Sequence, residues 1–198
     1  MKYAIIGSGK IGTALARIFA RKNIEVAIAN SRGPETLASS AEELGASVVP
    51  QSIQDALKAE IVFLAVPYSA HKDIAKQFKN RNGKVVVDAT NAFHVAPGEL
   101  QGRLSSEVLS EAFVGARVVK AFNHLPAEQL GTNSDDWRPQ AVFISSNDAP
   151  SSKTIATLAT QLGFAPIELG RLDQGGVPLH VVGGKPGGLL LQNLVKLG

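Results

Sequence analysis

Short apolar runs alternate along this chain with longer stretches in which apolar residues recur at helical spacing. Runs such as IVFLAV (61–66) and VVVDA (85–89) contain almost no polar residues, as is typical of parallel strands buried on both faces. The predicted strands are Tyr3–Ile6, Glu25–Ala29, Ser47–Val49, Ile61–Ala65, Lys84–Asp88, Arg117–Ala121 and Ala141–Ser145. The predicted helices between them are Ile11–Arg21, Pro34–Leu44, Ile53–Lys58, Ala70–Phe78, Pro126–Leu130 and Ser151–Leu162. This alternation predicts a doubly wound α/β fold with a mostly parallel, Rossmann-type sheet.

Residues that favour helix ends support these boundaries. Ser52 and Asp148 are placed to cap the helices that follow them, and Gly163 comes just after the last predicted helix. The stretch 97–112 is less regular, and we expect a loop with a short helix there. Because neither an internal repeat nor a linker divides the chain, residues 1–170 are predicted to form one domain.

The C-terminal segment 171–198 differs in composition from the rest of the chain. It contains three glycine pairs and ends in the apolar stretch LLLQNLVKL (189–197). The glycine pairs alone would suggest a flexible terminus. The apolar ending instead favours docking, either on the chain's own core or on a second subunit. We therefore expect a short appendage that belongs to the same unit or to the interface of a homodimer.

Composition and charge exclude several classes of function. The formal net charge is +3 and the 20 Lys and Arg residues are scattered, so a nucleic-acid-binding surface is not expected. The absence of cysteine rules out disulfides and thiolates, and the four histidines show no i,i+4 pair that would indicate a metal site. No apolar run approaches the ~18 residues of a membrane span, and MKYAIIG does not resemble a signal peptide. We expect a cytoplasmic protein.

The first predicted strand runs directly into the sequence GSGKIG, which has the spacing G-x-G-x-x-G. Between a strand and a helix, this spacing is typical of turns that bind the pyrophosphate of a dinucleotide. Gly7 would allow the tight turn, Gly9 would let the backbone approach the phosphates, and Gly12 would let the helix pack on the strand. The N-terminal N–H groups of the helix would then face the phosphates. A glycine-rich turn without a ligand is the alternative interpretation.

The end of the second strand, in AIANSRGPETL (27–37), bears on the choice of dinucleotide. Sites that prefer NAD usually carry Asp or Glu at this position, whereas this chain has Asn30 there, and the next carboxylate along the chain is that of Glu35. Ser31 can donate a hydrogen bond, and Arg32 can form charge-assisted hydrogen bonds with a phosphate. These residues predict a preference for NADP(H) through its 2′-phosphate. A solvated polar turn is the alternative.

Three further strand ends carry distinctive residues, with AVPY at 65–68, DATN at 88–91 and KAFNH at 120–124. Ligands of doubly wound folds bind at the carboxyl ends of strands, so we expect these segments to surround the nicotinamide end of the cofactor. Asp88 is interpreted as a residue that caps or braces a loop rather than a catalytic base. Lys120 could contact a phosphate, but a structural role near the sheet edge is preferred.

In order and spacing, the segments GSGKIG, NSRGPE, LAVP, DATN and VVKAFN resemble those of the NADPH-dependent coenzyme F420 reductase family. This family includes archaeal F420:NADP oxidoreductases, bacterial relatives of unassigned substrate, and the cytoplasmic domain of the six-transmembrane epithelial antigen of prostate metalloreductases. The resemblance covers about residues 2–170, and VVKAFN is its most specific part. It implies hydride transfer between NADP(H) and coenzyme F420, a flavin or a similar planar acceptor.

The motifs and the resemblance together imply a set of site residues. Those expected to bind the cofactor are Gly7, Ser8, Gly9, Lys10, Ile11, Gly12, Asn30, Ser31, Arg32, Ala65, Val66, Pro67, Ala89 and Asn91. Asn123 and His124 would lie near the face where hydride is transferred, and they are the candidate catalytic residues. His124 stands where the family commonly has Thr, a departure that bears on the identity of the acceptor.

The histidines carry different expectations. His124 is either a proton donor to the acceptor or a structural residue. His94 follows the DATN segment and is expected to line the cleft, whereas His71 lies in a predicted helix and is expected to be solvated. His180 receives no role. A Ser-His-Asp or paired-carboxylate site is not expected, because the cofactor carries the chemistry and the protein mainly aligns two rings.

Two other functions remain consistent with the sequence. One is an imine reductase of the pyrroline-5-carboxylate reductase type, although the large helical C-terminal domain of those enzymes is not expected here. The other is a non-catalytic sensor that binds NADP(H), whose sequence would look the same up to Asn91. The leading prediction is an NADPH-dependent oxidoreductase acting on a small-molecule hydride acceptor, with no nucleic-acid or membrane partner.

Overall fold

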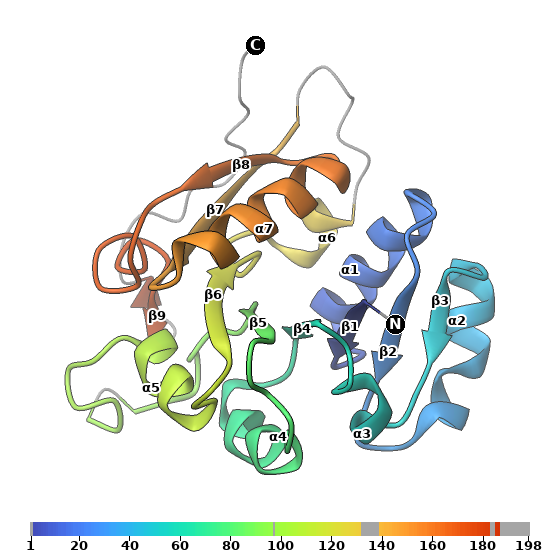
Figure 1. Cartoon of the computed structure of the whole chain (residues 1–198), viewed down its shortest axis with the longest axis horizontal. Coiled ribbons are helices and arrows are strands. Elements are labelled where there is room, and N and C mark those ends of the chain that lie inside the picture. The colour runs from blue at the N-terminus through green and yellow to red at the C-terminus, as the bar shows by residue number, and fades with distance from the viewer. Residues whose placement is uncertain (1, 97, 132–138, 183–184, 187–198) are drawn as a thin grey trace.

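The strand-forming runs associate into one sheet in the computed structural model, which describes residues 2–96, 98–131, 139–182 and 185–186 (Figure 1). The strands are β1 (Tyr3–Ile6), β2 (Val26–Ala29), β3 (Val48–Pro50), β4 (Ile61–Leu64), β5 (Val85–Asp88), β6 (Arg117–Ala121), β7 (Ala141–Ser146) and β8 (Ala165–Glu168). Their order is β3-β2-β1-β4-β5-β6-β7-β8. Neighbours pair in parallel except β6 and β7, which are antiparallel. The doubly wound, mostly parallel fold is confirmed.

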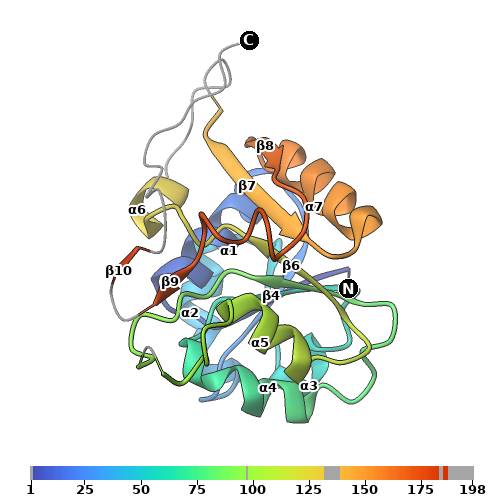
Figure 2. The same ribbon diagram turned by 90° about the vertical axis from the view of Figure 1, so that its left-hand side faces the viewer.

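Helices cover both faces of this sheet (Figure 2). The α-helices are α1 (Lys10–Arg21), α2 (Ala38–Leu44), α3 (Ile53–Ala56), α4 (His71–Gln77), α5 (Ser105–Ala112), α6 (Ala127–Leu130) and α7 (Ala149–Gln161). Two 3-10 helices, η1 (Pro34–Leu37) and η2 (Tyr68–Ala70), precede α2 and α4. Residues of α1, α2 and α7 pack on one face of the sheet, and those of α3, α4 and α5 pack on the other. Within the described ranges, no helix is long and apolar enough to cross a membrane.

The core consists of two apolar layers, one on each face of the sheet. Because side chains alternate along a strand, Ile5 of β1 belongs to the layer under α1, whereas Ala4 and Ile6 belong to the opposite one. A row of aromatic rings in the first layer comprises Tyr3, Phe19, Phe63, Phe122 and Phe164. Burial on both faces explains why the strands are continuous apolar runs in the sequence.

Some elements differ from the sequence prediction. β8 is missing from it, because a four-residue segment that contains Pro166 and Glu168 has no strand pattern. Proline is tolerated there because β8 is the edge strand of the described sheet. The predicted helix Pro34–Leu44 divides into η1 and α2, and the irregular stretch 97–112 contains the regular helix α5. The apolar strands and the longer helices are thus more predictable than the short elements.

The predicted helix caps are confirmed. Ser52 Oγ accepts a hydrogen bond from the Asp55 N–H at 3.1 Å at the start of α3. Asp148 Oδ2 accepts one from the Ser151 N–H at 2.9 Å at the start of α7. Gly163, just beyond α7, has φ 94°, the left-handed conformation that commonly ends a helix. These local signals fix where the two helices begin and where the last one stops.

The first part of the glycine-rich C-terminal segment is packed against the domain. Residues 171–180 form turns in which Leu172 and Leu179 are buried. The chain continues into a short antiparallel pair, β9 (Val181–Val182) and β10 (Lys185–Pro186). Residues 171–180 are therefore docked on the chain's own core. The apolar stretch 189–197 lies outside the described residues.

Candidate functional site

The G-x-G-x-x-G turn joins β1 to α1 and has the backbone geometry that a dinucleotide-binding turn needs. Gly7 has φ 114°, and its N–H donates to the Ala29 carbonyl at 2.8 Å. A Cβ on Gly12 would lie 1.9 Å from the Gly7 carbonyl oxygen, so only glycine lets α1 begin this close to the turn. A Cβ on Gly9 would meet nothing within 4 Å. A side chain at Gly12 would therefore clash with the turn itself, whereas the space beside Gly9 is free of protein atoms.

Asn30, at the end of β2, connects this turn to the loop that follows β2. Its Nδ2 donates to Ser8 Oγ and to Thr36 Oγ1, both at 3.1 Å. Its Oδ1 accepts from the backbone N–H of Arg32 at 2.9 Å. Asn30 thus holds together the two segments predicted to bind the pyrophosphate and the 2′-phosphate. Sequence reasoning does not identify Thr36, because this side-chain contact depends on how η1 folds back toward β2.

The residues predicted to meet the 2′-phosphate lie beside this connection. Ser31 and Arg32 are exposed, and a small cavity of about 70 Å³ opens among Ser8, Arg32 and the residues of η1 and α2. Within the described part of the chain, the Arg32 guanidinium has no ion-pair partner. Lys10 faces Glu128 at 3.8 Å, with both side chains exposed, and such surface pairs are weak. Both cations are therefore accessible to an anion.

Two of the three predicted strand ends, AVPY (65–68) and DATN (88–91), contribute to one cleft of about 520 Å³, whereas no residue of the third, KAFNH (120–124), lines it. Predicted cofactor residues that line it are Ile11, Ala65, Val66, Pro67, Ala89 and Asn91. Aromatic and aliphatic residues from η2, the loop after β5 and α5 also line it, among them Tyr68, Phe93, Val95, Leu100 and Val108. The cleft therefore joins the predicted nicotinamide site to an apolar space.

Two histidines line this cleft. His94 is one of them, as predicted. The expectation that His71 is solvated is wrong, because only 3% of the residue is exposed. Its ring lies 4.5 Å from the Tyr68 ring and its Nδ1 faces the Tyr68 carbonyl at 2.5 Å, so Nδ1 carries the proton in the neutral ring. Helical periodicity does not show this, because η2 places Tyr68 against the first turn of α4.

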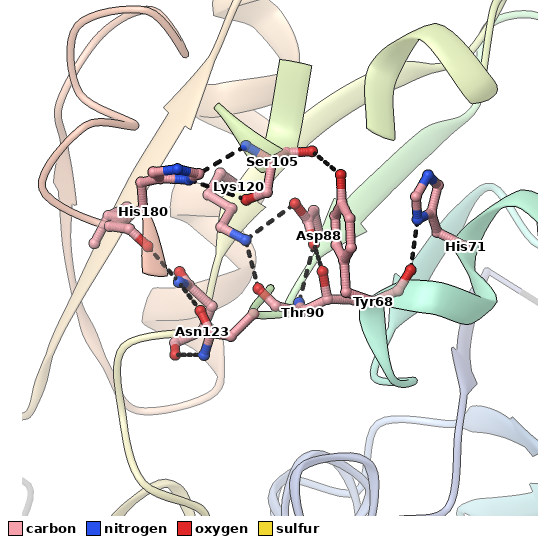
Figure 3. Close-up of polar contacts among 10 residues, drawn as sticks. Tyr68, His71, Asp88, Thr90, Ser105, Lys120, Asn123 and His180 are labelled. Atoms are coloured by element: carbon pink, nitrogen blue, oxygen red, sulfur yellow. Dashed lines mark hydrogen bonds and ion pairs between the residues drawn. The ribbon is translucent and has the colours of Figure 1, made fainter. Parts of the chain in front are cut away.

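Asp88 and Lys120, at the ends of β5 and β6, form a buried ion pair beside the cleft (Figure 3). Lys120 Nζ lies 3.0 Å from Asp88 Oδ2, and 2% and 0% of the two side chains are exposed. Thr90 donates to Asp88 Oδ1 through its N–H at 2.9 Å and its hydroxyl at 2.7 Å. The Thr90 carbonyl also accepts from Lys120. The two charges brace the sheet edge, which is the structural role predicted for them.

Asn123 holds the cleft-lining Asn91 in place. Its Nδ2 donates to Asn91 Oδ1 at 2.9 Å, and Asn91 Nδ2 donates to the Asn123 carbonyl at 2.8 Å. Asn123 Nδ2 also donates to the Leu179 carbonyl at 2.9 Å (Figure 3). Phe122, directly before it, has φ 63°, a strained value for a bulky side chain. The end of β6 is therefore held in an unusual conformation by contacts with the end of β5 and with the C-terminal segment.

His124 contacts β7 and is not among the residues that line the cleft. Its Nε2 lies 3.1 Å from the Ala141 carbonyl, and its ring centroid lies 5.0 Å from that of Phe143. Burial lowers the pKa of His124 below its usual value, so the ring is neutral at pH 7. These contacts are those of a packed residue between the end of β6 and β7. A catalytic role for His124 stays a prediction.

Tyr68 connects the cleft to the start of α5. Its hydroxyl donates to the Ser105 carbonyl at 2.9 Å, and burial raises the pKa of the phenol above its ordinary value. The N–H and the hydroxyl of Ser105 both lie 3.2 Å from His180 Nδ1 (Figure 3). Sequence reasoning assigns no role to Ser105 or His180, because their contact joins residues 75 positions apart. Across the described ranges, no three His, Cys, Asp or Glu residues gather as metal ligands.

Comparison with known proteins gives the family. The family model described as NADP oxidoreductase coenzyme F420-dependent matches residues 2–92. Metalloreductase STEAP3 of Rattus norvegicus is 30% identical over 173 residues, which cover 86% of this chain and 34% of that protein. The chain therefore spans about a third of the length of this curated relative.

Solved structures agree with this assignment. A hypothetical protein from Sinorhizobium meliloti is 44% identical, with a TM-score of 0.90 over 99% of this chain and 96% of that one. A putative F420-dependent NADP-reductase from Arthrobacter sp. FB24 is 26% identical, with a TM-score of 0.70 over 87% and 86% of the two chains. A reductive aminase from Aspergillus terreus shares the fold, at 19% identity, a TM-score of 0.62 and coverage of 90% and 57%. The chain described here belongs to the coenzyme F420-dependent NADP oxidoreductase family.

Proposed function

We propose that this chain is an NADPH-dependent oxidoreductase that transfers hydride between NADP(H) and a planar acceptor, such as coenzyme F420 or another deazaflavin, a flavin or a similar ring. The observation that carries this proposal is the cleft of about 520 Å³ at the ends of β4 and β5. Part of its lining comes from the ends of β4 and β5, where the nicotinamide is expected. The rest exposes mainly apolar surface, with Phe93 and Leu100 as examples, beside the charged Lys72 and Glu99. An apolar space adjoining the nicotinamide site suits a flat, conjugated acceptor.

Three features support NADP(H) as the cofactor. The glycine turn is open at Gly9, where a dinucleotide pyrophosphate would approach the backbone. Arg32 is exposed beside a small cavity and has no ion-pair partner among the described residues. The strand end carries Asn30 in place of the carboxylate that would repel a 2′-phosphate. The family description and the name of the Arthrobacter relative point to the same cofactor.

Bound NADPH would supply the hydride, so the chain itself must align and shield the reacting rings. Asn30 and the glycine turn would fix the phosphate end. Asn91, held by Asn123, would border the nicotinamide end. The apolar lining would exclude water from the space between the rings. In this proposal Asn123 acts through Asn91, and His124 supports the end of β6.

Stopped-flow spectroscopy tests the proposal and distinguishes the acceptors. The purified chain is mixed with NADPH and, in separate runs, with coenzyme F420, FMN or a ferric chelate, and NADPH oxidation is followed by its absorbance. The names of the Arthrobacter and rat relatives motivate the F420 and ferric runs. Saturable oxidation by a deazaflavin or flavin supports the proposal.

Two results contradict it. Tight NADPH binding without oxidation by any of these acceptors would indicate a cofactor sensor. Oxidation by a cyclic imine, with none by the planar acceptors, would indicate an imine reductase. A run with NADH in place of NADPH serves as the matched control for the cofactor.

A further inference from the structure

The C-terminal segment reaches the cleft from a distant part of the chain. We call residues 171–182 the C-terminal strap. Figure 3 shows its end beside the start of α5 and the end of β6. Its Leu179 carbonyl accepts from Asn123, and its His180 ring contacts Ser105. The strap therefore touches two elements that form or hold the cleft lining.

His180 adds an acceptor at the start of α5, beside the local contact in which Glu107 Oε2 accepts from the Leu104 N–H at 3.0 Å. The first N–H groups of a helix have no partner within the helix, and a polar side chain at the N-cap usually accepts from them. The N-cap of α5 is Leu104, whose side chain has no acceptor. The N–H of Ser105, the first residue of α5, instead donates to His180 Nδ1 at 3.2 Å. The start of α5 is thus held by a residue of the strap.

Ser105 also forms a hydrogen bond with Tyr68, a residue that lines the cleft. The Ser105 carbonyl accepts the hydroxyl hydrogen of Tyr68 at 2.9 Å, and Tyr68 lines the cleft with only 6% of the residue exposed. A continuous series of contacts therefore runs from His180 through Ser105 to Tyr68. A second contact from the strap, Leu179 to Asn123, reaches the cleft-lining Asn91.

We propose that His180 is a positioning residue for the hydride acceptor, because it holds Ser105 and thereby sets the position of the Tyr68 side chain in the cleft. The kinetic consequence of this inference rests on the proposed function. The structural consequence, that His180 fixes the start of α5, does not. The strap would therefore shape the part of the cleft that takes the acceptor and leave the phosphate-binding turn unaffected.

The contact requires an unprotonated Nδ1, since this nitrogen accepts a hydrogen bond from a backbone N–H. Burial lowers the pKa of His180, and the buried Lys120 cation of β6 acts in the same direction, whereas Glu107 of α5 opposes it. The neutral ring is therefore the form present at neutral pH. Protonation at acidic pH would turn Nδ1 into a donor facing another donor, and the contact with Ser105 would be lost.

Two substitutions of His180 and a control test the inference kinetically. His180→Leu removes the acceptor, whereas His180→Asn places an amide oxygen near the position of Nδ1. Asp173→Asn is the control in the same strap, because Asp173 is exposed and pairs with the exposed Arg171. His180→Leu is expected to raise KM for the acceptor about tenfold, as for the loss of one buried hydrogen bond, with kcat less affected. His180→Asn should restore most of this loss, and NADPH Kd should stay unchanged in all three variants.

A second readout needs no acceptor. Hydrogen exchange of the Ser105 amide, followed by NMR, reports directly on the contact with His180. In His180→Leu this amide should exchange about tenfold faster than in the wild-type chain, and in His180→Asn it should stay protected. If no acceptor oxidises NADPH, the proposed function fails while the exchange measurement still tests the role of His180.

Several results would overturn the inference. One is a His180→Leu variant with wild-type KM and wild-type exchange at Ser105. If His180→Leu does not fold, His180→Asn is compared with His180→Gln, whose amide oxygen lies one bond farther from the backbone. Equal KM values for these two variants would count against a positioning role of His180. The KM of the wild-type chain should also rise as the pH falls through the pKa of His180, which burial places below 6.5, while that of His180→Asn should not. The same pH dependence in both would contradict the role of His180.

Discussion

The two parts of the proposed site, a dinucleotide side and an acceptor side, are built from contacts of very different sequence separation. On the dinucleotide side, Asn30 contacts Ser8, 22 positions before it, and Thr36, six positions after it. On the acceptor side, Tyr68 contacts Ser105 across 37 positions, and Ser105 contacts His180 across 75 positions. The dinucleotide side is one βαβ unit, whereas the acceptor side is assembled from most of the remaining chain.

This difference has a physical consequence. The dinucleotide side depends mainly on the backbone conformation of the glycine turn and on residues close to β1, α1 and β2. A substitution there is therefore expected to act mainly on cofactor binding. The acceptor side depends on buried polar contacts between elements that meet only in the folded chain, and a buried polar group that loses its partner is costly. A change there is expected to act on the stability of the fold and on the shape of the cleft.

The largest effect is expected on the acceptor side, at the buried ion pair. Lys120→Met leaves the Asp88 carboxylate buried without its cation, and should lower the free energy of unfolding by about 3–5 kcal/mol. Urea unfolding of the variant beside wild type measures this, with exposed Lys153→Met as the matched control. A loss below about 1 kcal/mol would show that Thr90 alone satisfies Asp88.

The glycine turn offers a sharper comparison within the dinucleotide side. Gly12→Ala places a Cβ 1.9 Å from the Gly7 carbonyl oxygen and should lower the free energy of unfolding by about 1–3 kcal/mol. Gly9→Ala meets nothing within 4 Å and should leave stability unchanged while raising the Kd for NADPH. Thermal unfolding and NADPH titration separate the two. Unchanged NADPH affinity in Gly9→Ala would contradict a bound pyrophosphate at this turn.

A smaller, selective effect is expected at the 2′-phosphate position. Arg32→Glu removes a charge-assisted contact worth about 1.5–3 kcal/mol and should weaken NADPH binding about ten- to hundredfold, with far less effect on NADH. Isothermal titration with both cofactors measures the ratio. An equal loss for both would sink the assignment of Arg32 to the 2′-phosphate.

The smallest effect is expected from the pH dependence of stability. Burial lowers the pKa of His124 below its ordinary value of 6.5, so the unfolded chain takes up this proton at a higher pH than the folded chain does. The stability associated with neutral His124 is therefore fully present above pH 6.5 and is lost as the pH falls through the folded-state pKa. Urea unfolding from pH 8 to pH 5 measures the slope. His124→Phe, which cannot titrate, should flatten it, and an unchanged slope would assign the effect to other groups.

The dinucleotide side could be predicted from the sequence because its residue types encode backbone geometry. Gly7, Gly9 and Gly12 take up the environments expected of them, and Asp88 and Lys120 form the structural brace expected at the sheet edge. The mostly parallel sheet could also be anticipated, because parallel strands buried on both faces are continuous apolar runs, whereas the strand order comes from the structure. These predictions depend on local rules that the rest of the fold does not override.

The sequence says less about the surroundings of single side chains on the proposed acceptor side. His71 has the sequence environment of a solvated helical residue, yet η2 packs Tyr68 against it and buries it. His124 follows Asn123 directly, yet its contacts are with Ala141 and Phe143 of β7. In each case the environment of the histidine is set by a contact with another element, and neither helical periodicity nor motif spacing predicts that contact.

The sequence by itself determined the doubly wound sheet and the glycine turn between β1 and α1, and it predicted residues that would favour a 2′-phosphate, because strand burial, glycine conformation and charge act over a few neighbouring positions. Only the tertiary structure decided the acceptor side, where Tyr68, Ser105 and His180 meet. Their side chains converge from three separate elements, and hydrogen bonds over such separations form only after the sheet has brought those elements together.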